Sequence, residues 1–241
     1  MAQFVSLPYG PDPLQALNLY DHPAGAPCVL FVHGGGWQRG TKDRMTLAFQ
    51  HHANRLVDRF TVLSMDYRLA PATIFPGQVE DGDAALTWIN EHASEHGYDA
   101  STVVFVESAG AAVAVGPALS GRHPQVRGMI GFAGVYDLTV ENDETALGQL
   151  VATYLGCDPH ECLSTAQEAS PGQHVVTRVP SLLVHSTGDP VVGAYQSVLM
   201  ANVIGPEARL HFIPGSGHTG PDFQTPAVDA AVDALLARAF A

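Results

Sequence analysis

Basic residues are scarce in this chain of 241 residues. Lys and Arg together number 11, against 24 Asp and Glu, so the formal net charge is -13 at pH 7. A surface that binds nucleic acid needs clustered positive charge. We therefore expect no nucleic-acid partner. The chain has one lysine, Lys42, and nothing around it suggests Schiff-base chemistry.

Long apolar runs are also missing. No run reaches the roughly 20 residues that a helix needs to cross a bilayer. The first residues, Met1–Pro13, lack the basic start and the apolar core of a signal peptide. These observations predict a protein without membrane contact, and we expect it to be cytoplasmic.

Cysteine is rare, and no set of metal ligands is evident. Cys28, Cys157 and Cys162 cannot all pair with one another. Cys28 opens an apolar run and is predicted to be a buried thiol, and the sparse usage fits a reducing compartment. Cys157 and Cys162 flank an Asp-Pro-His-Glu segment, but zinc needs three or four converging ligands and the sequence shows no second cluster. We predict no metal and no other cofactor.

What the chain does contain is an alternation of short apolar strands and helical stretches. Such alternation predicts βαβ crossovers and a mostly parallel sheet with helices on both faces, which is the α/β class. The whole chain, 1–241, is expected to form one domain, with a small cap insertion at about 136–179. The expected strands are 17–20, 28–32, 61–65, 103–106, 126–132, 181–185 and 209–213, and the expected helices include 45–59, 78–96 and 226–239.

One stretch, Thr102–Val115, combines an apolar strand, a tight turn with a serine and a run of small residues suited to a closely packed helix. This layout is typical of a nucleophile elbow, whose pattern is Gly-x-Ser-x-Gly. Here the pattern reads V-E-S-A-G, so Val106 stands where the first glycine is usual and Ser108 is the candidate nucleophile. Taken alone, Ser108 could equally be an ordinary helix N-cap.

Other polar groups follow the ends of the neighbouring predicted strands. In open α/β sheets, functional groups gather beyond the carboxyl ends of the strands. The chain has a glycine loop with Gly34 and Gly35 at one strand end, and Ser108, Asp189 and His218 at three others. Their order, Ser, Asp, His, is that of α/β-hydrolases. Asp137 is the alternative acid, one strand earlier.

The motifs taken together resemble the α/β-hydrolase superfamily, in its small esterase and arylformamidase branch. LNLY, HGGGW, DYRLAP, SAGA, GVYDL and the segments of Asp189 and His218 recur there in this order, from about Leu17 to the C-terminus. HGGxW followed by SAGA is most similar to kynurenine formamidases. HGGG and DYRLAP are shared with esterases that resemble hormone-sensitive lipase.

The resemblance implies a role for each candidate residue. Ser108 is the expected nucleophile, because a serine hydroxyl attacks once a base takes its proton, and His218 is the expected base. Asp189 is expected to orient the imidazole. The expected oxyanion donors are the backbone N–H groups of Gly34, Gly35 and Ala109.

Further residues have less defined expected roles. Trp37 is predicted to be a pocket wall, and Glu107 either contacts the substrate or fills space. His33 is expected to hold the glycine loop, and Asp66 with Arg68 to form a structural pair. The remaining expectation concerns histidines in helical stretches, which are predicted to lie on the surface: His51, His52, His92 and His96.

The resulting prediction is a metal-free serine hydrolase that cleaves small carboxylic esters or N-formyl aryl amides through an acyl-enzyme on Ser108. The family also suggests a homodimer. Two alternatives stay open at this point. One is a peptidase or thioesterase on the same fold. The other is a degenerate hydrolase that binds a ligand, for which Val106 is the main support.

Overall fold

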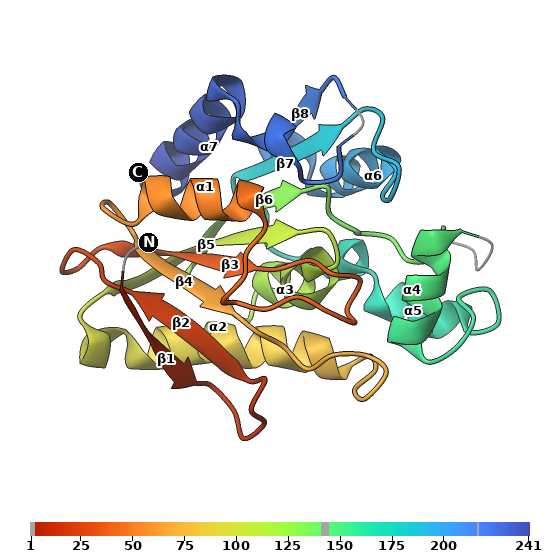
Figure 1. Ribbon diagram of the computed structural model, residues 1–241, viewed down its shortest axis with the longest axis horizontal. Helices are drawn as coiled ribbons and strands as arrows, with labels where there is room; N and C mark the ends of the chain where they lie inside the picture. The colour runs from red at the N-terminus through yellow and green to blue at the C-terminus, as the bar shows by residue number, and fades with distance from the viewer. Residues whose placement is uncertain (1–2, 141–144, 216) are drawn as a thin grey trace.

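The core of the protein is an eight-stranded sheet, seen in a computed structural model that describes residues 3–140, 145–215 and 217–241 (Figure 1). Its strand order is β1-β2-β4-β3-β5-β6-β7-β8. The β1–β2 and β2–β4 pairs are antiparallel, and every later pair is parallel, which confirms the predicted mostly parallel sheet. The strands are β1 (Phe4–Pro8), β2 (Ala16–Tyr20), β3 (Pro27–Val32), β4 (Thr61–Met65), β5 (Asp99–Glu107), β6 (Val126–Phe132), β7 (Ser181–Ser186) and β8 (Ala208–Ile213).

Helices cover both faces of this sheet (Figure 1). On one face, α1 (Leu47–Leu56) and α7 (Pro226–Ala239) cover a core rich in phenylalanine. On the other face lie α2 (Gly77–His96), α3 (Gly110–Leu119) and α6 (Tyr195–Ile204). Every residue of α3 is buried. Its alanine, glycine and valine side chains are small, which lets the helix axis come close to the sheet.

The central strands are buried on both faces because helices cover each side. Val106 is an example: its side chain is fully buried in the core that β5 shares with α2 and α3. In the parallel register it lies between Val32 of β3 and Gly131 of β6. The valine at the usual glycine position of the turn is thus accommodated as an ordinary core residue.

Two further helices, α4 (Ala146–Leu155) and α5 (Leu163–Ala169), lie beyond the carboxyl ends of the parallel strands (Figure 1). They fall in the stretch 136–179, for which a small cap was expected; residues 141–144 of that stretch lie outside the described residues. Thr145 caps α4, since its side chain accepts a hydrogen bond from the N–H of Gly148. A left-handed Gly156 ends the helix.

Cys157 and Cys162 form a disulfide that joins the end of α4 to the start of α5. Disulfides are rare in reducing compartments. The bond therefore weighs against the compartment expected from the small number of cysteines. Cys28 is a free, fully buried thiol, as predicted.

The predicted elements match the structure closely in the parallel part of the sheet. The expected helix 45–59 is shorter, because Thr46 caps α1 at its start and the helix ends at Leu56. The unpredicted elements include the antiparallel edge strand β1, helix α6 and the short 3₁₀ helices. Among the described residues, no helix is both long enough and apolar enough to cross a membrane.

Candidate active site

Ser108 stands at the sharp turn between β5 and α3. Its backbone has a φ of 51°, in the left-handed region that few residues other than glycine adopt. Three backbone hydrogen bonds hold it there: its N–H donates to the Phe132 carbonyl at 3.0 Å, and its carbonyl accepts from the N–H groups of Val135 at 3.2 Å and Ala111 at 3.1 Å. A Cβ on Gly110 would come within 2.4 Å of the Val32 carbonyl oxygen, so the second glycine of the turn is required for packing.

The glycine loop after β3 lies directly against this serine. A Cβ on Gly34 would be 2.9 Å from the Cβ of Ser108, so only glycine allows the approach. Gly35 has a φ of 115°, and a Cβ there would meet the Arg39 carbonyl at 2.0 Å. Gly34 thus lies against the serine, and Gly35 and Ala109 line the same pocket. The role of the three N–H groups as oxyanion donors stays a prediction.

His33 holds the glycine loop rather than facing the serine. Its Nδ1 lies 2.7 Å from the Gly34 carbonyl oxygen, which can only accept, so this nitrogen carries the proton. Tyr67 stacks on the imidazole at 4.4 Å between ring centroids and donates its hydroxyl proton to the His33 carbonyl. The expected structural role of His33 agrees with these contacts.

Ser108, His218 and Asp189 form one chain of hydrogen bonds. His218 Nε2 is 3.0 Å from Ser108 Oγ, and His218 Nδ1 is 2.7 Å from Asp189 Oδ2. A carboxylate only accepts, so Nδ1 carries the imidazole proton and Nε2 is free to accept the serine proton. The three side chains come from the ends of three different strands, β5, β7 and β8, as the sequence predicted.

The Asp189 carboxylate is fully buried and held by several donors. Burial raises its pKa, but hydrogen bonds from His185, His218 and the Val192 and Val191 N–H groups outweigh that effect. The net result is a pKa well below the ordinary value for aspartate. Asp189 therefore stays ionised beside His218 at neutral pH, and it can stabilise a positive charge on the imidazole.

The alternative acid, Asp137, does not join this chain. Its Oδ1 accepts hydrogen bonds from the N–H and the hydroxyl of Thr139, at 2.9 and 2.6 Å. Asp137 thus closes a local turn, in the way that short polar side chains commonly do.

Glu107, next to the serine, is buried and lines the pocket. Burial raises the pKa of Glu107, and contacts with the hydroxyls of Thr46 and Thr219 offset this only in part. The Thr46 hydroxyl donates to Glu107 Oε2 at 2.6 Å. Since Thr46 also caps α1 and Thr219 follows His218, Glu107 links the first turn of α1 to the histidine loop.

The pocket over Ser108 is small, about 240 Å³. Leu147 and Leu150 of α4 form one wall, and a Cβ on Gly36 would be 2.8 Å from Leu150. Trp37 contributes to the lining, as predicted, but it is fully buried and stacks on Tyr154 of α4 at 4.5 Å between ring centroids. The same indole therefore serves as pocket wall and as core.

Two expectations about charged residues were wrong. Asp66 and Arg68 do not pair: Asp66 faces Lys42, whose Nζ lies 3.4 Å away, and Arg68 pairs with the buried Asp81. His52 is not on the surface, because its side chain is fully buried between α1 and the sheet. Both errors concern partners that are distant in the sequence, which spacing alone cannot identify.

Sequence reasoning also missed several pocket residues, among them Thr46, Thr219, Leu147 and Leu150. Thr46 had a usable signal, since a threonine just before an apolar helical stretch is typical of an N-cap. Thr219 adjoins the predicted His218 and could have been included on that ground. Leu147 and Leu150 carry no motif, and only the placement of α4 brings them to the serine.

Comparison with known proteins assigns this chain to a family. The BD-FAE family model matches residues 18–204, well over half of the chain. The carboxylesterase NlhH of Mycobacterium tuberculosis is 40% identical over 85 residues, which make up 35% of this chain and 26% of NlhH. The chain thus spans about a quarter of that relative's length.

Two other similarities extend over most of the chain. The kynurenine formamidase of Meyerozyma guilliermondii is 26% identical over 239 residues, covering 89% of this chain and 84% of the relative. A solved structure described as a truncated carbohydrate esterase from gut microbiota superposes with a TM-score of 0.82 at 20% identity, covering 98% of this chain and 97% of that one. At that identity the likeness concerns the fold. The chain has the α/β-hydrolase fold and belongs to the BD-FAE family of α/β-hydrolases.

Proposed function

We propose that the protein is a serine hydrolase that cleaves small carboxylic esters or N-formyl aryl amides through an acyl-enzyme on Ser108. The observation that carries the proposal is the continuous chain of hydrogen bonds from Ser108 through His218 to the buried Asp189. The names of similar proteins support the same substrate classes, since one is a carboxylesterase and another a kynurenine formamidase.

The first half-reaction forms the acyl-enzyme. His218 Nε2 takes the Ser108 proton while Oγ attacks the substrate carbonyl, and the new negative charge faces the N–H groups of Gly34, Gly35 and Ala109. The His218 proton then passes to the leaving alcohol or amine as its bond to the carbonyl carbon breaks. Throughout these steps the ionised Asp189 keeps the imidazole in one tautomer and stabilises its positive form.

The second half-reaction returns the enzyme to its starting state. A water molecule gives one proton to His218 Nε2 and its oxygen attacks the acyl carbon. The tetrahedral intermediate then collapses, the acid is released, and the proton returns to Ser108 Oγ. The small pocket, bounded by Leu147 and Leu150, favours short acyl groups.

We further propose that the chain is a single domain in which residues 136–179 act as a small cap over Ser108. The contact of Leu150 with the glycine loop supports this role. The homodimer suggested by the family is part of the same proposal, and light scattering of the purified chain tests it: a mass of twice 25.5 kDa is expected.

The test of the function is a hydrolysis panel on purified protein. It compares p-nitrophenyl acetate and butyrate with N-formyl-kynurenine and uses Ser108→Ala as the blank. Preference for the formyl amide identifies an arylformamidase, and preference for the short esters identifies a carboxylesterase. Turnover that persists in Ser108→Ala, or no turnover of any of the three compounds, contradicts the proposal.

A further inference from the structure

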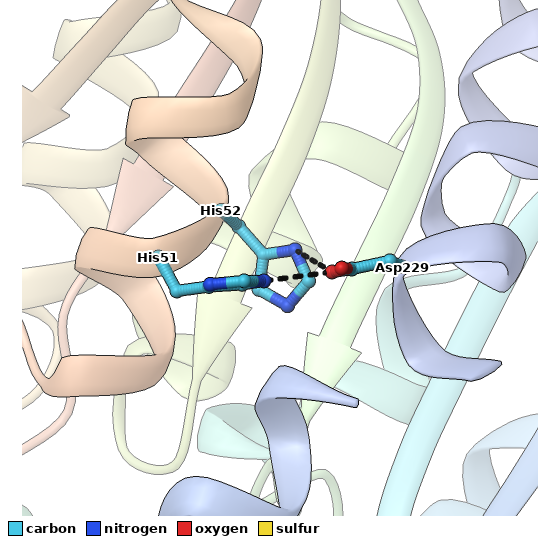
Figure 2. Close-up of side chains that lie close together, drawn as sticks. All are labelled: His51, His52 and Asp229. Atoms are coloured by element: carbon cyan, nitrogen blue, oxygen red, sulfur yellow. Dashed lines mark hydrogen bonds and ion pairs between the residues drawn. The ribbon is translucent and has the colours of Figure 1, made fainter. Parts of the chain in front are cut away.

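A second histidine–aspartate cluster lies away from the serine, between α1 and α7. His51 and His52 project from α1 toward Asp229 in the first turn of α7 (Figure 2). One ligand atom from each residue can be chosen so that all three lie within 4.8 Å of one another. We define these three residues as the α1–α7 cluster.

The environment of His52 is the unusual feature of the cluster. Its Nε2 lies 3.0 Å from the Phe223 carbonyl oxygen, so Nε2 carries the proton and Nδ1 carries a lone pair. That Nδ1 is buried without a hydrogen-bond partner, and it faces Asp229 Oδ1 at 3.6 Å. Asp229 Oδ1 already accepts a hydrogen bond from His51 Nε2, so the atom without a partner is His52 Nδ1. Buried polar atoms are rarely left unpaired, and a lone pair that points toward a carboxylate oxygen is suited to bind a cation.

The distances fit a first-row divalent metal. Zinc binds imidazole nitrogen at about 2.0–2.1 Å and carboxylate oxygen at about 2.0–2.2 Å in tetrahedral geometry, which places neighbouring ligand atoms about 3.3 Å apart. In the cluster, Asp229 Oδ1 is 2.9 Å from His51 Nε2 and 3.6 Å from His52 Nδ1. Small side-chain adjustments, with the His51 proton on Nδ1, would open all three ligand atoms to one ion.

The surroundings of the cluster also suit a metal site. A histidine ligand usually donates its other N–H to a carbonyl or carboxylate, and His52 does so to Phe223. The side chains of His51 and Asp229 are 29% and 21% exposed, which leaves a path for an ion and a water ligand.

One positive group opposes a cation here. Arg55 Nη1 lies 3.3 Å from Asp229 Oδ1, and its Nη2 is held by Asp233 at 2.7 Å. Asp233 also forms an ion pair with Arg59 at 2.8 Å. If a metal binds Asp229, Arg55 can therefore remain paired with Asp233. The positive charge of Arg55 should therefore weaken the binding of a cation without occupying its position. Removing that charge should tighten binding, which tests the proposal.

The sequence predicted no metal, because residues 51, 52 and 229 are too far apart along the chain to read as one ligand set. From the structure we propose that His51, His52 and Asp229 bind one Zn²⁺ or similar divalent transition-metal ion, with water as the fourth ligand, and that the ion ties α1 to α7. The site would also stabilise the short 3₁₀ helix Pro221–Gln224, because its Phe223 carbonyl anchors His52. That helix follows closely after His218 in the chain, so the ion would support the segment that carries the catalytic base.

The experiment uses the full chain without a histidine tag, stripped with chelator and titrated with ZnCl₂ by calorimetry. One Zn²⁺ per chain is expected. At a free concentration of 100 times Kd, Tm should rise by about 5–10 °C. Ca²⁺ and Mg²⁺ should have little effect, because imidazole ligands favour Zn²⁺, Co²⁺ and Ni²⁺ over these ions.

Three variants and one control locate the ion. His52→Gln keeps a donor for the Phe223 carbonyl but removes the imidazole ligand, and Asp229→Asn removes the charged ligand; each should weaken Zn²⁺ binding at least tenfold and abolish the Tm rise. Arg55→Gln should tighten binding several-fold. The control, His92→Gln on α2, removes a histidine that stacks on Trp88 and should bind Zn²⁺ as the parent does.

Two results would overturn the proposal. The first is that the parent chain shows no stoichiometric Zn²⁺ binding. The second is that Zn²⁺ binding persists in both His52→Gln and Asp229→Asn, because the ion would then lie elsewhere on the protein. If one of these variants fails to fold, the other decides, and a Tm measured without metal identifies such a failure.

Discussion

The Ser108–His218–Asp189 chain and the α1–α7 cluster both combine histidine with aspartate, but they use these side chains differently. In the first, both nitrogens of His218 are engaged, one by the Asp189 carboxylate and the other by the Ser108 hydroxyl. In the second, His52 donates from Nε2 to a carbonyl, and its Nδ1 has no hydrogen-bond partner. The two clusters therefore differ in whether the second imidazole nitrogen has a hydrogen-bond partner.

That difference determines the chemistry each cluster can perform. A histidine between a fixed carboxylate and a hydroxyl can take a proton from one side and be stabilised from the other, as a general base must. A buried histidine whose lone pair faces a carboxylate has no hydroxyl beside it to deprotonate, but it is suited to bind a cation. Residue type alone would not distinguish the two.

The largest effect should follow from replacing His218, the general base of the first cluster. His218→Gln leaves no group that can take the Ser108 proton, so kcat should fall by about 10⁵–10⁶-fold. Steady-state kinetics on p-nitrophenyl acetate measure the loss, and Zn²⁺ titration of the same variant should still give parent-like binding at the α1–α7 cluster. A loss of less than 100-fold would remove His218 from its proposed role.

The acid of the first cluster should come next. Asp189→Asn should lower kcat by about 10⁴-fold, because the amide favours the wrong imidazole tautomer and cannot stabilise its charge. The matched control is Asp137→Asn, which changes a carboxylate that contacts only its own turn through Thr139. If Asp137→Asn reduces kcat more than Asp189→Asn does, the two aspartates have been assigned in the wrong order.

Beneath the first cluster, Val106 should matter for stability rather than for rate. Val106→Gly removes a fully buried side chain and adds backbone freedom to β5, so it should destabilise the protein by about 2–4 kcal/mol. Denaturant unfolding measures this value, and Val176→Gly, at a position 76% exposed, is the control. A gain in stability would mean that valine crowds the turn after all.

The smallest effect concerns pH and Glu107, whose pKa is raised by burial. A group with a raised pKa in the folded state binds more protons folded than unfolded, so its contribution to stability is lost as pH rises through that pKa. Each unit of raised pKa corresponds to about 1.4 kcal/mol. Glu107→Gln should therefore raise Tm at pH 8 relative to the parent and raise it less, or not at all, at pH 4. An equal change at both values would contradict the buried, raised-pKa carboxylate.

The sequence predicted the parallel part of the sheet and the three residues of the Ser108 chain. Both follow from local signals: apolar runs such as Thr61–Met65 form the buried strands, and polar groups at their ends must meet at one edge. The Ser108 turn, the glycine loop and the His218 loop each carry a motif within a few residues. The structure places all three together.

What could not be predicted depends on contacts between distant segments. Strand β1 is mostly exposed and pairs only at the sheet edge, so its pattern is weak. The pairing of Asp66 with Lys42 and of Arg68 with Asp81 depends on how loops meet, as does the burial of His52 under α7. The Cys157–Cys162 disulfide lies in a segment whose helices gave only diffuse signals.

The most direct test of the central claim, that Ser108 is an activated nucleophile, is labelling with a fluorophosphonate followed by peptide mapping. Attack by Ser108 Oγ on phosphorus, with loss of fluoride, requires the base and the oxyanion donors to act together. We predict one adduct per chain, on Ser108, in the parent protein and a far slower reaction in His218→Gln. A folded parent protein that gains no adduct on Ser108 would contradict the account.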